Sequence, residues 1–407
     1  MGNSLQGKPS ADKVRVFANN DVWLEANAVA QLHTTAQLPH IHAAVGLPDL
    51  HAGRGYPIGA AFFSVGHLYP ALVGGDIGCG MALWRTGLKA HKTSPARLEK
   101  LLGSQEGPLP QALLAQAQPE LAALCHDAAL PLPAAQLAGS LGSIGGGNHF
   151  AELLACEQLY AAPEGDGPAD ADAATTATTA VCAALDPKAV YLLVHSGSRG
   201  LGGAILRAQV EAHGHAGLAA DTPQAQHYLM QHEAALRYAR LNREAIAQRF
   251  LQALRSDGLP LLDVSHNHVL PATHDGLQGF IHRKGATPAD VGPVLIPGSR
   301  GDYSYLVQPL PGCDAALNSL AHGAGRKWAR SDCMGRLAPR FQASALRKTR
   351  LGSTVVCNDK ALLYEEAPQA YKAIDSVIAS LLEAGLVRLL ARFKPLLTYK
   401  KGGQPCC

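Results

Sequence analysis

Hydrophobic positions along the chain alternate between short strand-like runs and longer stretches with helical spacing. Runs bounded by Gly and Pro fill most of residues 1–90 and recur at residues 190–194, 261–264 and 294–296. Helical spacing predicts helices within residues 20–37, 94–137, 232–254 and 371–392. Pro residues interrupt the second of these helices, and Pro395 is expected to end the last one. Strands and helices are mixed and no long repeat stands out, so we predict an α/β (mixed α+β) fold.

The composition favours one large domain. The chain has 407 residues, of which 47% are hydrophobic and 16% charged, so it can bury a large core. We therefore expect residues 1–407 to form a single catalytic domain. Residues 161–180 are mainly small or polar and offer little to bury, which predicts a flexible surface insertion. Residues 403–407 are expected to form a tail.

Charge and cysteine content limit the class of protein. The net charge of +3 is too small to indicate nucleic-acid binding by itself, because only clustered charge makes a useful field. The nine cysteines form an odd number without disulfide-framework spacing, and no signal-peptide pattern begins the chain. No apolar run reaches the roughly 18 residues that a membrane span needs. These features predict a soluble protein of the reducing cytoplasm.

Five Gly-rich turns carry the residue types of metal and phosphate chemistry. They lie at residues 73–80, 142–152, 194–200, 264–268 and 322–326. Small residues let side chains converge and let backbone approach a ligand closely. Taken singly, each turn is as easily a structural loop, for example a tight turn around a buried cysteine. The hypothesis of a functional site depends on the five together.

Ligands for metal ions are spread over four of the turns. Asp76 and Cys79 lie three residues apart, and His149, His195 and His266 follow in later turns. In a strand, His266 and His268 would point to one face, so either both bind one ion or one of them packs. One Asp, one Cys and three or four His could build two adjacent metal sites. The ligand types alone fit either Zn²⁺ or Mn²⁺.

The fifth turn presents a histidine among glycines. His322 is followed four residues later by Arg326, which suits an imidazole nucleophile attacking a phosphorus whose charge a guanidinium offsets. The glycines before Asn148 could free backbone N–H groups to cradle phosphate. Basic residues accumulate over residues 326–350, which is either a solvated face or a track for an RNA backbone.

Several motifs in a fixed order identify a family. They are LPDLH at residues 47–51, GYPIG at 55–59, GDIGCGM at 75–81, GNHF at 147–150, HSGSRG at 195–200, PGS at 297–299 and HGAGR at 322–326. In this order, over residues 43–402, the chain resembles the RtcB RNA-splicing ligases. The resemblance implies a single large RtcB-like domain with a central metal and nucleotide pocket.

The resemblance also implies an activity. It implies a GTP- and Mn²⁺-dependent RNA ligase that joins 2′,3′-cyclic phosphate or 3′-phosphate ends to 5′-hydroxyl ends, in RNA repair or tRNA splicing. His322 Nε2 would attack the α-phosphorus of GTP and carry GMP, with Arg326 as a further catalytic residue. The implied ligands of two Mn²⁺ ions are Asp76, Cys79 as the bridge, His149, His195 and His266. The implied nucleotide-binding residues are Asn148, His149, Phe150, Ala151, Glu152, His266, Asn267, Pro297, Gly298, Ser299, Arg300, Ser304, His322, Gly323, Ala324, Gly325 and Lys400.

One residue assignment is open, and three features depart from the usual family pattern. The nucleotide-closing lysine matches Lys400 by its distance from Pro395 and Lys401 by its neighbour Gly402, and we favour Lys400. Arg300 stands where the family usually has a methionine, residues 52–54 (AGR) stand where it has Pro-Gly-Lys, and residues 403–407 extend past the usual end. Together with the segment at residues 21–25 and the insertion at residues 161–180, these departures resemble the branch associated with release factor H. That resemblance implies a functional link to a release factor and the repair of damaged RNA.

Two other functions fit the same residues. A metal-dependent phosphoesterase could hydrolyse cyclic phosphate ends without joining them, and it would carry no GMP on His322. A non-catalytic RNA- or ribosome-binding factor could keep the fold while binding no Mn²⁺.

Overall fold

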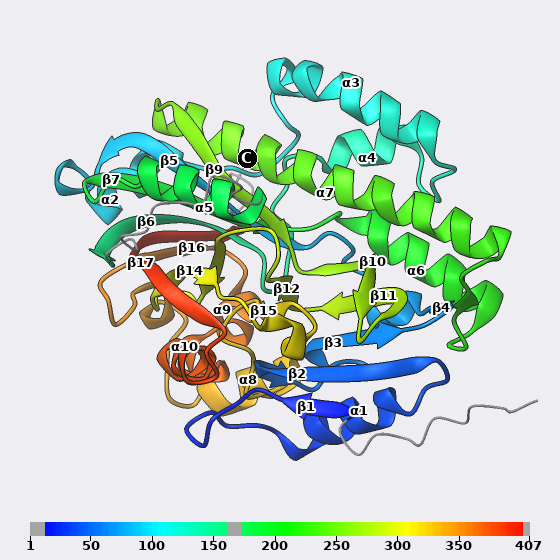
Figure 1. Ribbon diagram of the computed structural model, residues 1–407. Coiled ribbons are helices and arrows are strands. Elements are labelled where there is room, and N and C mark those ends of the chain that lie inside the picture. The colour runs from blue at the N-terminus through cyan, green and yellow to red at the C-terminus, as the bar shows by residue number, and fades with distance from the viewer. Residues whose placement is uncertain (1–12, 161–172, 402–407) are drawn as a thin grey trace, which may run out of the picture.

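A curved sheet of eight strands forms the centre of the part of the chain described by this computed structural model, residues 13–160 and 173–401 (Figure 1). Seven strands run in the order β13 (Val294–Pro297), β14 (Ser304–Pro309), β17 (Val387–Lys401), β6 (Phe150–Leu159), β7 (Ala189–Ser196), β5 (Gly80–Lys89) and β9 (Gly258–Ser265). The eighth, β16 (Thr354–Cys357), pairs in parallel with β17, whereas the other neighbours are antiparallel.

A second sheet lies beside the first. Its order is β1 (Val14–Val16), β2 (Ile41–His51), β3 (Ile58–Ser64), β11 (Leu277–Lys284) and β10 (Asn267–His274). Two short pairs complete the strands of the described residues. They are β12 (Ala286–Pro288) with β15 (Ser319–Ala321), and β4 (His67–Leu68) with β8 (Leu218–Ala219).

Helices cover the sheets from outside. The long helix α7 (Pro223–Leu254) crosses the upper side of the molecule in Figure 1, and α3 (Gln111–Asp127) and α4 (Ala134–Ser140) lie beyond it. The Thr222 hydroxyl accepts a hydrogen bond from the Ala225 backbone N–H and so caps the start of α7. The remaining α-helices are α1 (Ala26–Ala36), α2 (Pro95–Leu102), α5 (Ala173–Ala184), α6 (Gly200–His213), α8 (Arg330–Leu337), α9 (Lys360–Glu365) and α10 (Ile374–Glu383).

Strand β7 shows why the central sheet is buried on both faces. All eight of its residues are buried. Val190, Leu192 and Val194 pack into one core cluster, whereas Tyr191 and Leu193 pack into another. Alternate residues of a strand point to opposite faces, so an unbroken apolar run lets β7 contribute to both clusters.

The antiparallel pairing brings the predicted turns to one edge of the sheet. Gly80, at the start of β5, is paired with Ser196 at the end of β7 and with Ser265 at the end of β9. Phe150, at the start of β6, lies opposite His195. In an antiparallel sheet the start of one strand meets the end of its neighbour, so turns distant in sequence become neighbours in space.

The observed elements confirm most of the predicted ones. Strands β7, β9 and β13 contain the predicted runs, and the predicted mixed α/β class is confirmed. The predicted Pro-interrupted helical region is divided into α2, α3 and α4. The helix predicted within residues 232–254 begins earlier, at Pro223.

The helix predicted over residues 371–392 is confirmed as α10, but its predicted C-terminal end is wrong. Helix α10 ends at Glu383, and β17 begins at Val387 and continues through Pro395. Gly385 adopts φ 66°, a left-handed conformation that ends helices. The register shifts between Pro395 and Leu397, and such an irregularity accommodates a proline inside a paired strand.

The predicted tail lies wholly outside the described residues, and the predicted insertion lies partly outside them. Residues 161–172 and 402–407 lie outside them. From residue 173 onward the segment forms α5, in which Thr178 and Val181 are buried. Among the described helices, none combines the length and apolar character needed to cross a membrane.

Candidate metal and nucleotide site

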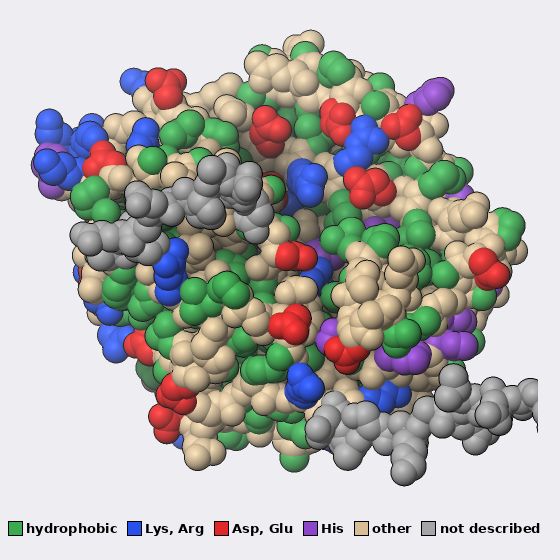
Figure 2. Space-filling view, in the orientation of Figure 1, with side chains coloured by type: hydrophobic (Ala, Val, Ile, Leu, Met, Phe, Trp, Pro, Cys, Tyr) green, Lys and Arg blue, Asp and Glu red, His purple; other side chains and the backbone are tan. Residues whose placement is uncertain are grey.

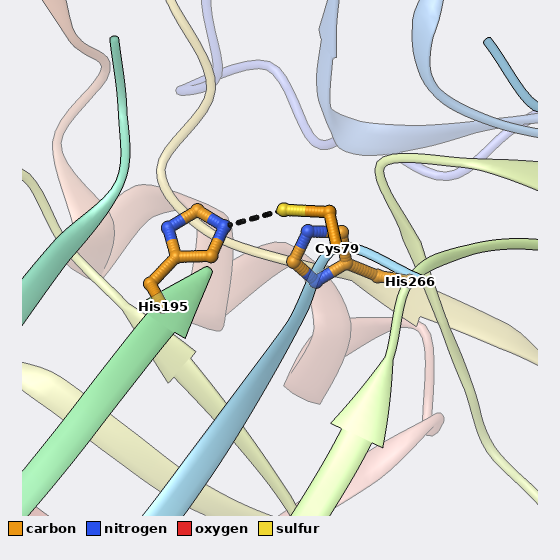
Figure 3. Close-up of side chains that lie close together, drawn as sticks. All are labelled: Cys79, His195 and His266. Carbon is orange, nitrogen blue, oxygen red and sulfur yellow. Dashed lines mark hydrogen bonds between the residues drawn. The ribbon is translucent and has the colours of Figure 1, made fainter. Parts of the chain in front are cut away.

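Two overlapping groups of metal-type ligands lie at the shared edge of the central sheet. One contains Asp76, Cys79 and His149, and the other contains Cys79, His195 and His266. Within each group the ligand atoms lie within 4.8 Å of one another. Cys79 Sγ is 3.3 Å from His149 Nε2 and 3.2 Å from His195 Nε2, and Figure 3 shows it facing the His195 ring beside His266. The fold therefore brings together all five predicted ligands, with Cys79 common to both groups.

The surroundings of these ligands favour cation binding. Burial, followed by the charge of neighbouring histidines, lowers the pKa of His195 and of His266 well below the usual value, so both rings are neutral at pH 7. Neutral imidazole is the form that binds metals. Burial and then the Asp76 carboxylate raise the pKa of the Cys79 thiol. A cation bound there would displace the thiol proton, as metal binding to cysteine does.

Local packing sets the position of Asp76. A Cβ atom at Gly197 would lie 2.2 Å from Asp76 Oδ1, so only glycine leaves room for the carboxylate. Asn267 Nδ2 donates to the Asp76 carbonyl at 3.0 Å, and Asn267 Oδ1 accepts from the Gly285 N–H at 2.7 Å. Buried Arg243 donates to the Gly78 carbonyl at 2.6 Å and so fixes the same turn.

His322 lies next to the ligand groups and is held by a carboxylate. Its ring centroid is 4.7 Å from that of His266. Asp49 Oδ2 accepts a hydrogen bond from His322 Nδ1 at 2.6 Å and another from the His322 backbone N–H at 3.1 Å. Because a carboxylate only accepts, this hydrogen bond puts a ring proton on Nδ1, and in the neutral ring Nε2 is then the nitrogen with the lone pair. Gly325, with φ 70°, allows the approach, because a Cβ there would lie 2.3 Å from the Asp49 carbonyl oxygen.

A cavity of about 970 Å³ joins these parts. Its volume is at the upper end of the range typical of small-molecule sites. The predicted site residues that line it are Asp76, Cys79, Asn148, Phe150, His195, His266, Asn267, Pro297, Gly298, Ser299, Arg300, His322, Gly323, Ala324, Gly325, Arg326 and Lys400. Four other predicted residues are buried but are not part of this lining, namely His149, Ala151, Glu152 and Ser304.

A buried acid organises the basic residues of the cavity wall. Glu366 is 2% exposed and forms ion pairs with Arg326 (3.1 Å), Arg330 (3.2 Å) and Lys400 (3.9 Å). Burial alone would raise the pKa of Glu366, but these three cations lower it to about 2. Arg326 also donates to the Tyr371 hydroxyl at 3.0 Å. Arg326 is thus a fixed positive charge in the wall.

The two C-terminal lysines differ. Lys400 is 3% exposed, lines the cavity and lies with Nζ 5.7 Å from the centroid of the Phe150 ring. Burial lowers the pKa of Lys400 to about 8, although Glu366 opposes the shift. Lys401 is exposed and its Nζ lies 3.6 Å from Asp359 Oδ2. The fold therefore puts Lys400, and not Lys401, in the cavity wall.

Sequence reasoning left some functional candidates unassigned. Asp49 lies in the LPDLH motif at residues 47–51, and the sequence assigned it no role of its own. A carboxylate inside an apolar strand was the signal that could have identified it. Glu366 and the cavity-lining Lys284, whose pKa burial lowers to about 8, gave no motif signal. His268 forms part of neither ligand group in the described residues. Its Nε2 accepts a hydrogen bond from Arg283 at 3.0 Å, so it packs beside the site.

This combination defines a class of enzyme. Two overlapping groups of metal-type side chains, a histidine hydrogen-bonded to a buried carboxylate and a basic cavity wall are parts suited to metal-assisted reactions at phosphorus. The family model described as "tRNA-splicing ligase RtcB" matches residues 31–129 and 132–401. The chain belongs to the RtcB family and is an RNA ligase of that type.

Individual relatives support the same assignment. The chain is 48% identical over 396 residues to "RNA-splicing ligase RtcB2" of Escherichia coli, covering 97% of this chain and 98% of that protein. It is 34% identical over 294 residues to "RNA-splicing ligase RtcB" of Mycobacterium tuberculosis, covering 63% of this chain and 64% of that protein. It is 28% identical over 424 residues to "RNA-splicing ligase RtcB" of Escherichia coli K12, covering 93% of this chain and 95% of that protein.

Proposed function

We propose that this ligase uses GTP and two Mn²⁺ ions to join RNA 2′,3′-cyclic phosphate or 3′-phosphate ends to 5′-hydroxyl ends, with GMP carried on His322. The setting would be RNA repair, with tRNA splicing as the related use. One observation carries the proposal: His322, oriented by Asp49, shares one cavity with a ligand cluster bridged by Cys79.

The ligand set fits two divalent cations. Asp76 and His149 would serve one ion, His195 and His266 the other, and Cys79 both. When bound, the ions would neutralise negative charge on phosphate and on the reacting oxygens. The neutral histidines and the carboxylate suit Mn²⁺, whose open coordination positions can accept phosphate oxygens.

His322 is suited to the nucleophilic role. Its Nε2 lone pair would form a bond to the α-phosphorus of GTP while the bond from that phosphorus to pyrophosphate breaks. Asp49 would stabilise the positive charge that the imidazole acquires, as a carboxylate does behind a catalytic histidine. A cyclic phosphate end would first be hydrolysed to a 3′-phosphate. An oxygen of the RNA 3′-phosphate would then bond to the phosphorus of GMP while the bond to His322 Nε2 breaks. Finally the 5′-hydroxyl oxygen would bond to the RNA 3′-phosphorus, with loss of its proton and release of GMP, leaving a joined strand. This order makes a poor electrophile reactive, because GMP is a better leaving group than oxide.

The cavity wall and the buried residues behind it support nucleotide binding. Ser304 Oγ does not line the cavity, and it has no hydrogen-bond partner among the described residues, so the fold leaves its hydrogen bonding incomplete. Lys400 supplies a cation beneath the cavity surface. The Glu152 carboxyl accepts a hydrogen bond from the Thr398 hydroxyl, and burial raises its pKa to about 8. Such buried polar groups are stabilised when a ligand completes their hydrogen bonds.

The cavity mouth supports RNA binding. Lys327, Arg330 and Arg336 line it together with Trp23 and Trp328. Trp23 is 48% exposed, and the Arg336 guanidinium lies 5.1 Å from the Trp328 ring centroid. Figure 2 shows acidic and basic side chains interspersed on the face drawn, without a large patch of one sign. The lining of the cavity therefore offers cations for phosphates and indoles for the bases of an RNA end.

Covalent labelling tests the proposal. The protein is incubated with Mn²⁺ and α-labelled GTP, denatured, and analysed on a gel, and RNAs with defined ends are assayed for joining. We expect label on the wild type and on His213→Ala, an exposed control, and none on His322→Ala. Label that persists in His322→Ala would refute the role of this histidine. An unlabelled wild type that opens cyclic phosphates would be a phosphoesterase, and one that binds RNA but no Mn²⁺ would be a non-catalytic factor.

A further inference from the structure

Lys372 is a buried lysine that lies just before α10 and is not part of the cavity lining. It is 4% exposed. Its Nζ donates to the Pro48 carbonyl at 2.9 Å and to the Leu50 carbonyl at 2.7 Å, the backbone acceptors on either side of Asp49. Burial lowers the pKa of Lys372 to about 8, although the Asp49 carboxylate opposes the shift. The fold therefore keeps a cation beside the carboxylate that holds His322.

Strand β2 is irregular where it carries Asp49. It pairs with β3 up to Gly46 and again at His51, and the register shifts between these two residues. Buried carbonyls in an irregular stretch need hydrogen-bond donors from outside the ladder. Lys372 Nζ serves two of these carbonyls, and His51 Nδ1 donates to the Asp49 carbonyl at 2.8 Å. Side chains thus fix three consecutive carbonyls of the strand.

The carboxylate of Asp49 depends on this backbone for its position. Its Oδ2 is bonded to His322, whereas the buried Oδ1 has no hydrogen-bond partner among the described residues. A Cβ at Gly59 would lie 2.8 Å from Oδ1, so the neighbouring strand fits closely around the carboxylate. The Lys372 backbone N–H also donates to the Gly325 carbonyl at 3.0 Å, in the turn that carries His322. Lys372 therefore joins the strand of Asp49 to the turn of His322.

We propose that Lys372 is a positioning residue for the nucleophile, an inference that rests on the proposed role of His322 as the carrier of GMP. Its two hydrogen bonds fix the place at which Asp49 meets the imidazole, and its charge balances that of the buried carboxylate. A buried charge is destabilising without an opposite charge nearby. Because Lys372 bonds to the adjacent carbonyls and not to the carboxylate, it leaves Oδ2 free for the His322 ring.

Single-turnover labelling by α-labelled GTP with Mn²⁺ tests the inference. Lys372→Met removes the donors and the charge, and Lys372→Gln removes the charge but keeps an N–H donor. The matched control is Lys100→Met, at an exposed position of α2. We expect Lys372→Met to slow labelling roughly 10- to 100-fold, as a displaced catalytic group does, and Lys372→Gln to slow it less. Labelling of Lys100→Met should be unchanged. GMP affinity and bound Mn²⁺ should stay at wild-type values, because Lys372 does not line the cavity.

A double-mutant cycle with Asp49→Asn separates positioning from a general effect on the fold. If Lys372 acts through Asp49, adding Lys372→Met to Asp49→Asn should slow labelling by less than about twofold more. Factors that multiply would show that Lys372 acts elsewhere, and they would overturn the inference. A loss of GMP affinity in parallel with the labelling rate, or wild-type labelling of both Lys372 variants, would overturn it as well. Thermal unfolding checks each variant, and Lys372→Gln replaces Lys372→Met in the cycle if the latter does not fold.

Proton NMR of the His322 Nδ1–H observes the same contact without the reaction. A proton in a short hydrogen bond to a carboxylate resonates far downfield, and loss of the signal in His322→Ala assigns it. We expect the signal to shift in both Lys372 variants and to stay in place in Lys100→Met. An unchanged signal in both Lys372 variants would contradict the positioning role. A wild type that shows these shifts but takes no label would contradict the proposed chemistry of His322 and leave the positioning role intact.

Discussion

The hydrogen bond between Asp49 and His322 offers the sharpest test of how the proposed nucleophile is prepared. Asp49 is fully buried, and its Oδ2 accepts from His322 Nδ1 at 2.6 Å. Asp49→Asn keeps the size of the side chain but removes its charge. The new amide can also donate to Nδ1, which would move the ring proton to Nε2, the atom expected to attack phosphorus.

The expected loss follows from these two effects. A hydrogen bond to a charged group contributes about 1.5 to 3 kcal/mol, which corresponds to a roughly 10- to 150-fold loss when the imidazolium loses its carboxylate. Reversal of the ring tautomer adds to this loss. In the serine protease triad the same Asp-to-Asn change lowers kcat by about 10⁴-fold. We therefore expect labelling of Asp49→Asn to be slower by a factor on the order of 10² to 10⁴.

The assay is single-turnover labelling by α-labelled GTP with Mn²⁺, followed over time after rapid quenching. GMP affinity is measured in parallel, and it should change little, because Asp49 does not line the cavity. Asp275→Asn is the matched control, since the Asp275 side chain is 87% exposed. Thermal unfolding of both variants shows whether each is folded.

Labelling of Asp49→Asn within twofold of the wild-type rate would refute the reasoning, because neither charge nor tautomer would then matter. A parallel loss of GMP affinity would instead mean that Asp49 shapes the binding site. A slow rate with wild-type affinity and stability is the outcome that the geometry predicts.

Three further predictions concern other parts of the site. Cys79→Ala removes the side chain common to both ligand groups, so the amount of Mn²⁺ bound per chain should fall in elemental analysis. An unchanged metal content would exclude a bridging role for Cys79. Lys400→Ala should weaken GMP binding at least roughly tenfold, because a charged contact is lost, whereas Lys401→Ala should leave GMP binding unchanged. Equal effects of the two substitutions in titrations with GMP would contradict this assignment. The pKa of Glu366 falls from 4.5 to about 2 on folding. Its carboxylate therefore stabilises the fold above pH 4.5 by on the order of 3 kcal/mol. That contribution is lost as the pH falls toward 2. Glu366→Gln should therefore be less stable than wild type at pH 7 in denaturant titrations, with a smaller difference near pH 3, and a difference independent of pH would show that Glu366 is not held ionised.

Much of the site was predictable because its signals are local. Asp76, Cys79 and His149 lie in Gly-rich turns beside strand-like runs, and both the turn and the chemistry of each side chain can be recognised within a few residues. Buried strands such as β7 were predictable for the same reason, because a continuous apolar run indicates burial whether or not the neighbouring strands are known.

The error at the C-terminus shows where local signals fail. Residues 387–392 carry apolar side chains at spacings that suit either a helix or a strand. The decision came from β6 and β14, which offer backbone partners to β17 from far along the chain. Pairing with neighbouring strands outweighs the intrinsic secondary-structure propensity of the segment, but it cannot be recognised from the residues of the segment itself.

The sequence by itself determined which chemical groups are present, the turns that carry them and the family to which they belong. Only the tertiary structure decided that His268 packs while His266 joins the ligand group, and that Lys400 rather than Lys401 enters the wall. Only it revealed that Asp49 holds His322 and that Lys372 binds the carbonyls on both sides of Asp49. The physical reason is that hydrogen bonding and burial depend on distances between atoms, and the folded chain alone sets these distances for residues far apart in sequence.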